Sequence, residues 1–385
     1  MNTQILEFLT TQKRQVHEFL KELVVIQSGS HNKSGVDQVG RRIEKEMTAL
    51  GFSCEFDRQT DHGNTLIARS PGGAKACPQI LITGHMDTVF PEDTEFRHFS
   101  QDENHCYGPG VADMKGGLAV GIFGIKAALN AGVCPPLTFI FNSDEEIGSP
   151  TSREAIAREA KKSMAGLVLE AGGLNGEIVT GRKGNLSIAL DVSGGSGHAA
   201  FAGKDKASAI LELAHKTIAI EKINQPEKGI SANVGKIEGG LGRNSIAQHA
   251  RADVDFRFPT PEDEARIKKQ ISTIMEAPAT IKGTRTKYEV TSGRPPMPQT
   301  QGNRDLYGRV ETLAEKLNIP VKEELRQGVS DANIIASQGT PVIDGLGPCG
   351  AKDHSADEYI LKKSLWDRTL LFAHILADFH GQRPS

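Results

Sequence analysis

The feature of this sequence that most constrains its fold is a series of short, almost wholly apolar runs that alternate with helical patterns. Apolar residues recur at helical spacing over 5–23, 36–50 and 118–129. The strand-like runs between and after them cover residues 65–68, 79–83, 137–141 and 167–169. Strands that lack polar alternation are buried on both faces. The order therefore predicts an α/β fold, with helices on both faces of a mixed sheet.

A second pattern begins near Gly184, where strands and helices follow the order β-α-β-β-α-β of a ferredoxin-like α+β unit. The predicted elements cover residues 186–192, 206–220, 233–237, 247–256, 261–274 and 284–290. A Pro- and Gly-rich linker is expected over 292–298, after which a helix from Asp305, a short strand and a C-terminal helix resume the first pattern. We expect one domain from residues 1–183 and 294–385, with residues 184–293 inserted as a second domain.

The charge balance and the apolar runs exclude two classes of partner. The 385 residues include 45 Lys and Arg against 48 Asp and Glu, for a formal net charge of −3. A nucleic-acid surface normally needs a basic excess, and a membrane span needs ~20 consecutive apolar residues, which no run approaches. Residues 1–23 mix charged and apolar side chains and lack the core of a signal peptide, so a cytoplasmic location is expected.

The cysteines indicate neither a disulfide framework nor a thiolate zinc site. They are odd in number and show no CxxC spacing. They are Cys54, Cys77, Cys106, Cys134 and Cys349. We expect ordinary buried or half-buried thiols.

A histidine and an aspartate end the apolar run that begins at Ile80. His85 and Asp87 are two residues apart, and such positions on an extended chain point the same way. Asp87 can then accept the N–H of one ring nitrogen of His85 and leave the other nitrogen for a metal. A surface histidine with a chance acidic neighbour would give the same pattern.

Carboxylates occur at comparable places further along the chain. Asp113 precedes the helix at 118–129 in a glycine-rich loop, where it either caps the helix or bridges two cations. Asp144, Glu145 and Glu146 follow the run at 137–141 directly. Three adjacent acids at a strand end repel one another unless a cation or proton compensates, although a solvated acidic loop is the alternative.

Two further candidates complete the set. Glu170 closes the run at 167–169, and His354 stands in a glycine-containing segment near the C-terminal helix. All but one of the candidates follow strand-like runs, and the carboxyl ends of strands are where open α/β sheets build their sites. Imidazole and carboxylate donors suit Zn²⁺, with Co²⁺ or Mn²⁺ as substitutes, whereas Ca²⁺ disfavours histidine.

Four parts of the sequence stand out in combination: Gly84-His-Met-Asp-Thr-Val-Phe-Pro91, Gly108-Pro-Gly-Val-Ala-Asp-Met-Lys-Gly-Gly117, Asp144-Glu-Glu-Ile-Gly-Ser149 and His354. Together they resemble the M20 family of di-zinc metallopeptidases, most closely its glutamate carboxypeptidase (carboxypeptidase G2-like) branch. The resemblance covers nearly the whole chain and implies two Zn²⁺ per subunit. It also implies that the inserted domain is a lid and dimerisation module, so a homodimer is expected.

The resemblance implies two sets of metal ligands that share one aspartate: His85, Asp113 and Glu170 for one zinc, and Asp113, Glu146 and His354 for the other. It makes Glu145 the general acid/base and Asp87 the orienting partner of His85. Family members with a glutamate at the position of Glu170 are carboxypeptidases or deacylases, which argues against an aminopeptidase.

Five residues match positions that contact substrate in the family: Arg294, Arg257, Asn244, Lys183 and His198. Arg294 would bind the α-carboxylate of a C-terminal residue through paired hydrogen bonds. His198 would complete the oxyanion site of the partner subunit. A solvated side chain is the alternative for each. The stretch around Asn244 departs from the family pattern, because it lacks the proline usual after Asn-x-Ile.

The expected function is hydrolysis of an amide bond that releases a C-terminal amino acid, of glutamate type, from a small peptide or N-acyl amino acid. Two Zn²⁺ against three ligating carboxylates leave one positive charge, which favours a hydroxide that Glu145 helps to generate. One alternative is an acetylornithine deacetylase or succinyl-diaminopimelate desuccinylase, from which Arg294 would distinguish the carboxypeptidase. The other is a non-catalytic binding protein, in which Glu145 would have no use.

Overall fold

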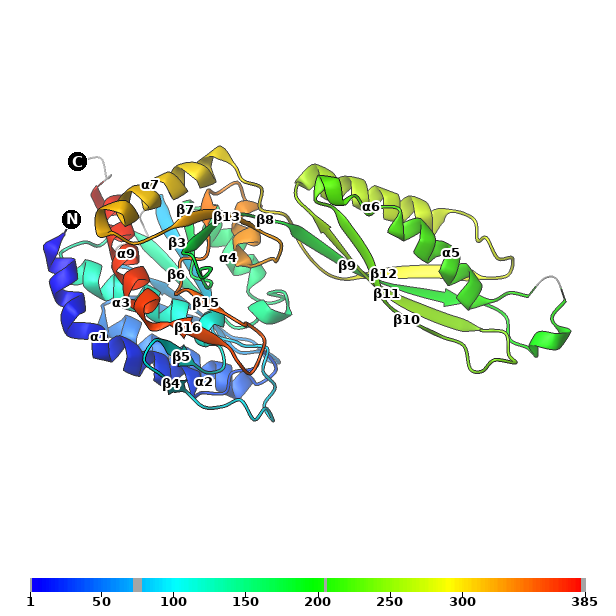
Figure 1. Cartoon of the computed structure of the whole chain (residues 1–385), viewed down its shortest axis with the longest axis horizontal. Helices are drawn as coiled ribbons and strands as arrows, with labels where there is room; N and C mark the ends of the chain where they lie inside the picture. Colours follow the sequence, from blue (N-terminus) through cyan, green and yellow to red (C-terminus); the bar gives the residue numbers. More distant parts are fainter. Residues whose placement is uncertain (1, 72–77, 204–205, 382–385) are drawn as a thin grey trace. The chain divides into compact units, whose positions relative to one another are not determined.

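Two structural units make up the chain in the computed structural model, which describes residues 2–71, 78–203 and 206–381 (Figure 1). Unit 1 consists of Met1–Gly181, Gln299–Arg326 and Ser330–Ser385. Unit 2 consists of Arg182–Pro298 together with Gln327–Val329. Each unit has its own sheet and its own hydrophobic core.

A six-stranded mixed sheet, in the order β1-β2-β6-β3-β7-β14, forms the centre of unit 1. Its strands are β1 (Ser53–Asp57), β2 (Thr65–Arg69), β3 (Gln79–His85), β6 (Leu137–Asn142), β7 (Ser163–Val168) and β14 (Val342–Ile343). The four strands β6, β3, β7 and β14 are parallel, while β2 and β1 continue the sheet in antiparallel fashion. Every residue of β3 and β6 is buried, which explains why their sequences show no polar alternation.

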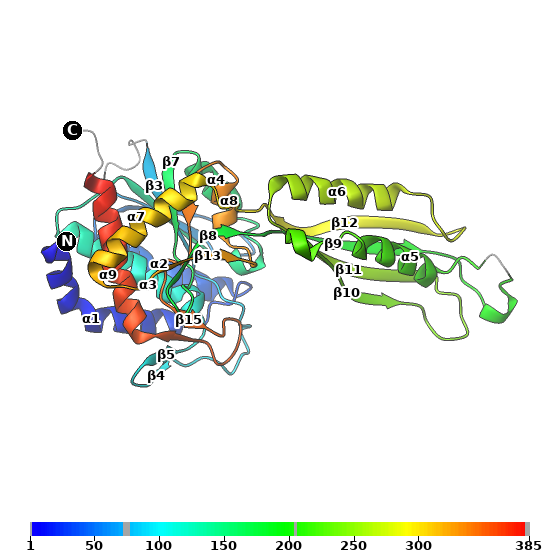
Figure 2. The same cartoon turned by 45° about the horizontal axis from the view of Figure 1, so that its top comes forward.

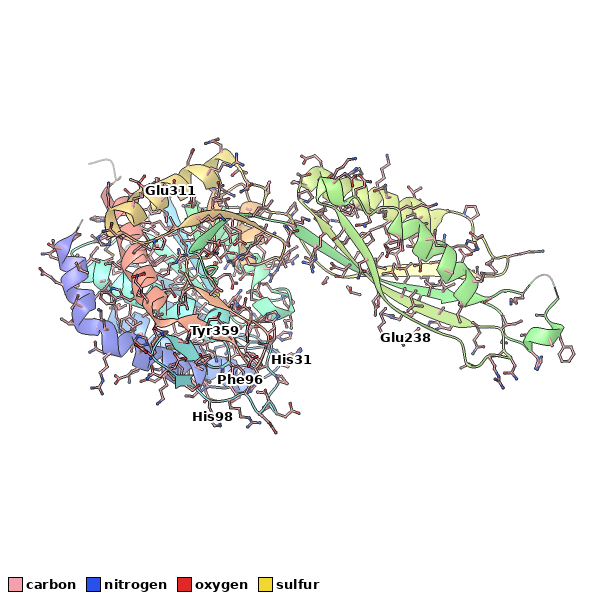
Figure 3. The ribbon with its side chains drawn as sticks, viewed as in Figure 1. His31, Phe96, His98, Glu238, Glu311 and Tyr359 are labelled. Atoms are coloured by element: carbon pink, nitrogen blue, oxygen red, sulfur yellow. The ribbon has the colours of Figure 1, made fainter. Side chains whose placement is uncertain are left out.

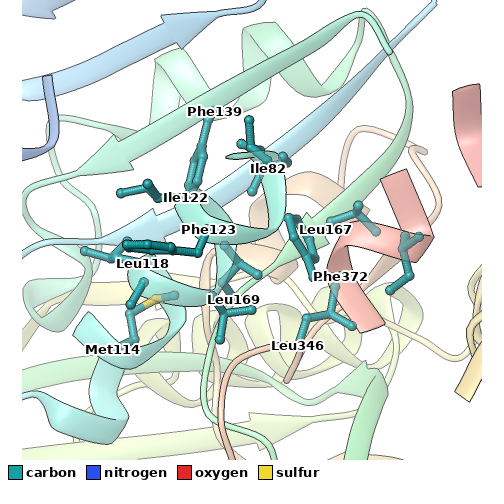
Figure 4. Packing of buried hydrophobic residues seen from close by; sticks show 14 of the residues in the cluster. Ile82, Met114, Leu118, Ile122, Phe123, Phe139, Leu167, Leu169, Leu346 and Phe372 are labelled. Atoms are coloured by element: carbon teal, nitrogen blue, oxygen red, sulfur yellow. The ribbon is translucent and has the colours of Figure 1, made fainter. Parts of the chain in front are cut away.

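Helices cover both faces of this sheet, as the sequence predicts. They are α1 (Thr3–Val24), α2 (Lys33–Ala49), α3 (Gly116–Asn130), α4 (Arg153–Ala160), α7 (Gln301–Leu317), α8 (Asp331–Ala336) and α9 (Lys362–Gly381). Helices α1, α3, α7 and α9 pack against one another, and α7 and α9 are seen side by side in Figure 2. Their core includes Ile82, Phe139 and Leu167 from the sheet and Phe372 from α9 (Figure 4).

The opposite face of the sheet is covered by α8. Gly166 precedes the core residue Leu167 in β7, so the two residues face opposite sides of the sheet. A Cβ on Gly166 would lie 2.8 Å from Cγ2 of Ile335 in α8. Helices α4 and α8 pack against each other and against β7, and therefore form the second helical layer.

Two small sheets, which the sequence pattern does not predict, complete unit 1. One has the order β15-β16-β5-β4, from β4 (Ser100–Gln101), β5 (His105–Tyr107), β15 (Gly350–Ala351) and β16 (Tyr359–Leu361). The other pairs β13 (Lys322–Arg326) with β8 (Glu177–Arg182). Most of these strands are too short to show a hydrophobic period. In the first sheet, β5 pairs with β16 and so joins residues near 105 to residues near 360. This pairing connects the parts of the chain that carry the candidate residues Asp113 and His354.

Unit 2 confirms the predicted β-α-β-β-α-β order. Its antiparallel sheet has the order β10-β11-β9-β12. The elements are β9 (Gly184–Ser193), α5 (Ala209–Glu221), β10 (Ser231–Gly239), β11 (His249–Phe258), α6 (Pro261–Glu276) and β12 (Arg285–Arg294). Both helices pack on the face of β9 that carries Leu186, Ile188 and Leu190 (Figure 1). The other face of the sheet carries polar residues such as Asp191, Arg251 and Arg257.

Two predicted boundaries in unit 2 are wrong by more than two residues. Helix α5 begins at Ala209 rather than at residue 206, because the Ser208 hydroxyl caps it by accepting the Leu211 N–H. Strand β12 continues to Arg294, so residues 292–294 of the predicted linker are strand. The pairing extends because Arg294 lies opposite Asn185 and donates its N–H to the Asn185 side chain at 2.9 Å.

Two expectations from composition can be compared with the described residues. Within them, no helix combines the length and the apolar character that crossing a bilayer requires. No disulfide forms among the four cysteines they include, while Cys77 lies outside them.

A glycine at the start of α3 fixes the distance between this helix and β7. A Cβ on Gly117 would lie only 1.8 Å from the carbonyl oxygen of Leu169. The start of α3 therefore approaches the end of β7 more closely than any side chain would allow.

We expect Gly117→Ala to lower the free energy of unfolding by about 1–3 kcal/mol or more, because the added methyl group must displace the backbone at Leu169. Gly308→Ala in α7 is the matched control, since a Cβ on Gly308 would have nothing within 4 Å of it, and alanine there should be neutral or stabilising. Thermal and urea unfolding of both variants would measure this. Equal stabilities would contradict the close approach.

Candidate metal centre

The carboxyl ends of three parallel strands meet at one edge of the unit 1 sheet. His85, the last residue of β3, is in register with Asn142 of β6, and Thr83 is in register with Val168 of β7. Glu170 therefore falls level with His85. The acids after β6 follow at the same edge, where Glu145 begins a 3₁₀ turn, Glu145–Ile147. Parallel pairing thus gathers residues that are far apart in the sequence.

Asp113 reaches this edge from a π-helical turn, Val111–Lys115, that directly precedes α3. Gly110 before the turn has a φ of +74°, which is in the left-handed region that favours glycine. Asp113 has a non-helical backbone, and its peptide bond to Met114 is cis. Asp113 does not cap α3: Lys115 occupies the N-cap position, and the cap has no side-chain hydrogen bond. The helix-capping alternative is therefore wrong.

The two histidines contact opposite oxygens of the Asp113 carboxylate. Nε2 of His85 lies 2.9 Å from Oδ1, and Nε2 of His354 lies 3.2 Å from Oδ2. A glutamate stands beside each histidine. Oε1 of Glu170 is 3.7 Å from His85 Nε2, and Oε2 of Glu146 is 3.4 Å from His354 Nε2. These contacts group the five residues into the same two sets that the resemblance implies, while their role as ligands stays a prediction.

The spacing of these groups suits a metal ion. His85, Asp113 and Glu146 each offer one ligand atom, and the three atoms lie within 4.8 Å of one another. Oε1 of Glu146 is buried and has no hydrogen-bond partner among the described residues. A buried carboxylate oxygen without a donor is costly, and a cation would satisfy it. The donor set therefore fits a divalent metal.

The carboxylates of this site destabilise one another's charged forms. Burial and the nearby Asp113 raise the pKa of Glu146 to about 8, and Glu145 adds to the repulsion. Burial, with Asp113 and Glu145, raises the pKa of Glu170 well above its usual value. Such a group of acids requires compensating positive charge.

The histidines carry that positive charge as protons. Contacts with Asp113 and Glu146 raise the pKa of His354 to about 11. Burial favours neutral His85, but Glu170, Asp113 and Asp87 outweigh it and raise its pKa well above the usual value. The same histidines hold the pKa of Asp113 below its usual range despite burial. Metal binding needs neutral imidazole and would therefore release these protons.

Asp87 contacts four residues, of which the sequence pattern predicts one, His85. Nδ1 of His85 lies 2.9 Å from the Asp87 carbonyl oxygen and 3.3 Å from its carboxylate, so the carbonyl is the nearer acceptor. The carboxylate accepts the Ser30 hydroxyl at 2.7 Å. It also accepts the N–H groups of Glu145 and Glu146, both at 3.2 Å. Asp87 thus anchors the 3₁₀ turn as well as the imidazole.

Three of the five predicted substrate residues lie at one end of the unit 2 sheet. Arg257 of β11 and Arg294 of β12 both lie opposite Asn185 of β9, on the polar face. Lys183 precedes β9 directly, and burial together with the Arg257 charge lowers its pKa. Arg257 also donates to Asp255 at 2.8 Å. This end of the sheet therefore concentrates positive charge.

His198 and Asn244 lie at the other end of that sheet. They adjoin each other, since the Ala199 N–H donates to the Asn244 carbonyl oxygen at 2.9 Å. Both come beyond the pairing of Ser193 with His249, the last pair between β9 and β11. Ser193 lies eight residues after Asn185 in β9, a distance of about 26 Å along an extended strand. The five residues thus form two separate groups.

Two buried charged residues beside Asp113 escape the sequence reasoning. Glu358 accepts backbone N–H groups from the loop of Asp113, and its only sequence signal is its place four residues after His354. Lys115 is fully buried and donates to the Ile26 carbonyl oxygen at 2.8 Å. Burial lowers its pKa to about 7. A lysine directly after Asp113-Met114, in a glycine-rich stretch with few polar residues, is the signal that marks it.

Comparison with known proteins places this geometry in a family. The model of peptidase family M20/M25/M40 matches residues 81–378, which include the five clustered histidine and carboxylate residues. The chain belongs to this peptidase family. M20/M25/M40 enzymes are metal-dependent, so the chain is an enzyme of the metallopeptidase and amidohydrolase type.

Individual relatives cover almost the whole chain at low identity. Carboxypeptidase G2 of a Pseudomonas species is 28% identical over 378 residues, which are 96% of this chain and 90% of that protein. Succinyl-diaminopimelate desuccinylase of Xanthomonas oryzae is 27% identical over 345 residues, covering 82% and 86%. The crystal structure of aminopeptidase PepT from Bacillus cereus has a TM-score of 0.78 at 24% identity, covering 95% and 98%, which shows a shared fold.

We predict that Glu146→Gln stabilises the chelator-treated protein at high pH. The protonated form of Glu146 contributes stability that is present below its ordinary pKa of 4.5 and is lost as the pH rises through about 8. Glutamine has no charge to bury, so the variant should exceed the wild type by about 1–3 kcal/mol near pH 9 and match it near pH 5.

Thermal unfolding in chelator across this pH range would measure the difference. Zn²⁺ should reverse the order, because the wild type would gain more stability from the ion than the variant. A variant that is less stable than the wild type in chelator at both pH values would contradict the repulsion.

Proposed function

We propose that this enzyme is a di-zinc hydrolase of the glutamate carboxypeptidase branch, which releases a C-terminal amino acid from a small peptide or N-acyl amino acid. The observation that carries the proposal is the placement of two imidazoles on opposite oxygens of Asp113. A single carboxylate between two imidazoles, with a glutamate on each side, is suited to holding a pair of cations.

Two sets of residues would hold the ions: His85, Asp113 and Glu170, and Asp113, Glu146 and His354. Nitrogen and oxygen donors of this kind favour Zn²⁺, with Co²⁺ or Mn²⁺ as substitutes. When bound, the two ions supply Lewis acidity that lowers the pKa of a water and polarises the scissile carbonyl.

Glu145 would move the protons of the reaction. The negative charge of Glu145 helps to raise the pKa of both Glu146 and Glu170, which indicates that its carboxylate lies close to the two sets of ligands. Its backbone N–H is fixed by Asp87. From this position Glu145 would take a proton from the attacking water and pass it to the leaving amide nitrogen.

The positive group of Lys183, Arg257 and Arg294 supports a substrate with a free carboxylate. Arginine binds carboxylates through paired, charge-assisted hydrogen bonds. Carboxypeptidase G2, the relative matched over 96% of this chain, supports the same choice. The similarity to a succinyl-diaminopimelate desuccinylase supports the amidohydrolase alternative, in which the same metal residues would serve a deacylation.

We also propose the predicted division into a catalytic domain and an inserted lid and dimerisation domain. The distance of about 26 Å between Asn185 and the end of β9 supports a homodimer, because His198 and Asn244 would then serve a partner subunit. Unit 2 offers exposed apolar side chains for such contacts, including Phe201 and Leu241, which are 86% and 84% exposed.

Replacement of the general acid/base tests the proposal most directly. We expect Glu145→Gln to lower kcat about 10²- to 10⁴-fold, because the amide cannot accept the proton of water. Metal content should remain that of the wild type, since Glu145 is in neither set of ligands. Release of free amino acid and elemental analysis would give the two values.

Glu154→Gln is the control, because Glu154 is an exposed acid in the first turn of α4. Activity of the wild type should vanish on chelation and return with Zn²⁺. Full activity of Glu145→Gln would disprove the role of Glu145, and a wild type that is inactive across acyl-amino acids and dipeptides would support the non-catalytic alternative.

The charge of Arg294 should determine the preference for a free carboxylate. We expect Arg294→Ala to lower kcat/KM on N-acyl-glutamate about 10- to 100-fold, the usual worth of a hydrogen bond to a charged group. The loss should be much smaller on the α-carboxamide of the same compound, because that substrate lacks the charge.

Arg251→Ala is the control. Arg251, in β11, lies on the same polar face of the unit 2 sheet as Arg294, but it stands opposite Asp191, with which it forms an ion pair at 3.0 Å. Equal losses on the acid and the amide would refute the carboxylate contact. Preference of the wild type for N-acetylornithine or succinyl-diaminopimelate over N-acyl-glutamate would instead support the deacylase alternative.

A further inference from the structure

We infer that Glu358 is a positioning residue that sets the place of Asp113 in the metal centre. The inference rests on the proposed function, and it concerns a residue outside both sets of proposed metal ligands. Glu358 is fully buried and immediately precedes β16, the strand that includes Tyr359 (Figure 3). Its side chain contacts the loop of Asp113.

The Glu358 carboxylate accepts three backbone N–H groups from one loop. Oε2 accepts the N–H of Gly110 at 2.9 Å. Oε1 accepts the N–H of Ala112 at 2.7 Å and that of Asp113 at 3.0 Å. One side chain therefore holds the proposed bridging residue itself and two of the three residues before it.

The loop needs this acceptor because its own backbone does not supply enough of them. Within the turn, Val111 donates to the Gly108 carbonyl oxygen and Lys115 donates to that of Gly110. The N–H groups of Gly110, Ala112 and Asp113 have Glu358 as their acceptor instead. Buried backbone donors are almost always paired, and each one left unpaired costs about 1–3 kcal/mol.

The same contact controls where the Asp113 oxygens point. Asp113 must direct Oδ1 to His85 and Oδ2 to His354 at once, which leaves little freedom for its Cα. Metal ligands must be held to within about 0.5 Å by their supporting residues. Oε1 of Glu358 binds the N–H of Asp113 directly, so it fixes the backbone from which that side chain projects.

A single short segment, residues 350–361, thus supports Asp113 from two sides. His354 comes from the loop between β15 and β16 and contacts the Asp113 side chain. Glu358, at the end of that loop, holds the Asp113 backbone. The loop is tied together by a hydrogen bond from the Glu358 N–H to the Ser355 carbonyl oxygen at 3.2 Å. The pairing of β16 with β5 secures its end.

The test compares Glu358→Gln with a matched variant of another buried glutamate. Glutamine has nearly the same shape but replaces one carboxylate oxygen by an NH₂ donor, so at least one loop N–H would face a donor. Glu212 is also fully buried and accepts a backbone N–H, that of Ile281 at 2.8 Å, but it belongs to unit 2. Glu212→Gln therefore controls for the general cost of altering a buried glutamate.

The measurements are the affinity for Zn²⁺, the visible absorption spectrum of the Co²⁺-loaded full chain and the thermal midpoint. We expect Glu358→Gln to weaken Zn²⁺ binding about 10- to 100-fold, which is the usual effect of replacing a residue that holds a metal ligand in place. The substitution should also change the Co²⁺ spectrum. Glu212→Gln should lower the thermal midpoint without altering either metal reading. Glu358→Asp keeps both oxygens on a shorter side chain and should weaken metal binding less than glutamine does.

The outcomes separate this inference from the proposed function. A wild type that binds Zn²⁺ and Co²⁺, with Glu358→Gln binding as tightly and showing the same spectrum, would overturn the positioning role alone. So would equal losses of metal affinity in Glu358→Gln and Glu212→Gln. A wild type that binds neither ion would overturn both proposals. If Glu358→Gln does not fold, Glu358→Asp decides: weaker binding supports the role, and wild-type binding overturns it.

Discussion

Repulsion among buried carboxylates is the constraint on which the rest of this structure depends. Burial and mutual proximity push the pKa of Glu146 and Glu170 upward, while the two histidines draw that of Asp113 downward. The site is stable only with positive charge at its centre, in the form of protons or of metal ions. This balance distinguishes the arrangement from a solvated acidic loop, and it explains why the residues fit a metal ion.

The fold brings these charges together by two independent devices. Parallel pairing of β3, β6 and β7 places His85, Glu146 and Glu170 at one edge of the sheet. Asp113 instead depends on glycine, because α3 can begin against β7 only where Gly117 leaves room for the Leu169 carbonyl. The first device tolerates many apolar sequences, whereas the second depends on single positions. Glycine at the start of α3 is therefore required by packing, and not only by the turn that carries Asp113.

The sequence predicts the parts of this molecule whose signal is local. Apolar runs reveal β2, β3, β6 and β7, although not β1, and the polar residues that end them reveal His85 and Glu170. Glu358 shows no comparable signal, because its role depends on backbone donors some 250 residues away that adopt their positions only in the fold. The short strands β4, β5, β15 and β16 also lack a detectable period. Likewise, spacing alone does not reveal that Arg294 and His198 lie at opposite ends of one sheet.

The insertion of unit 2 between Glu170 and His354 also affects how the protein is made. A ribosome that has finished β7 must still synthesise the whole of unit 2 before it reaches the second histidine. At ordinary translation speeds this interval lasts on the order of 10 s. During that time the nascent polypeptide has the acids of the centre but lacks His354, the second histidine on Asp113. The centre is therefore completed only after the intervening unit has left the ribosome.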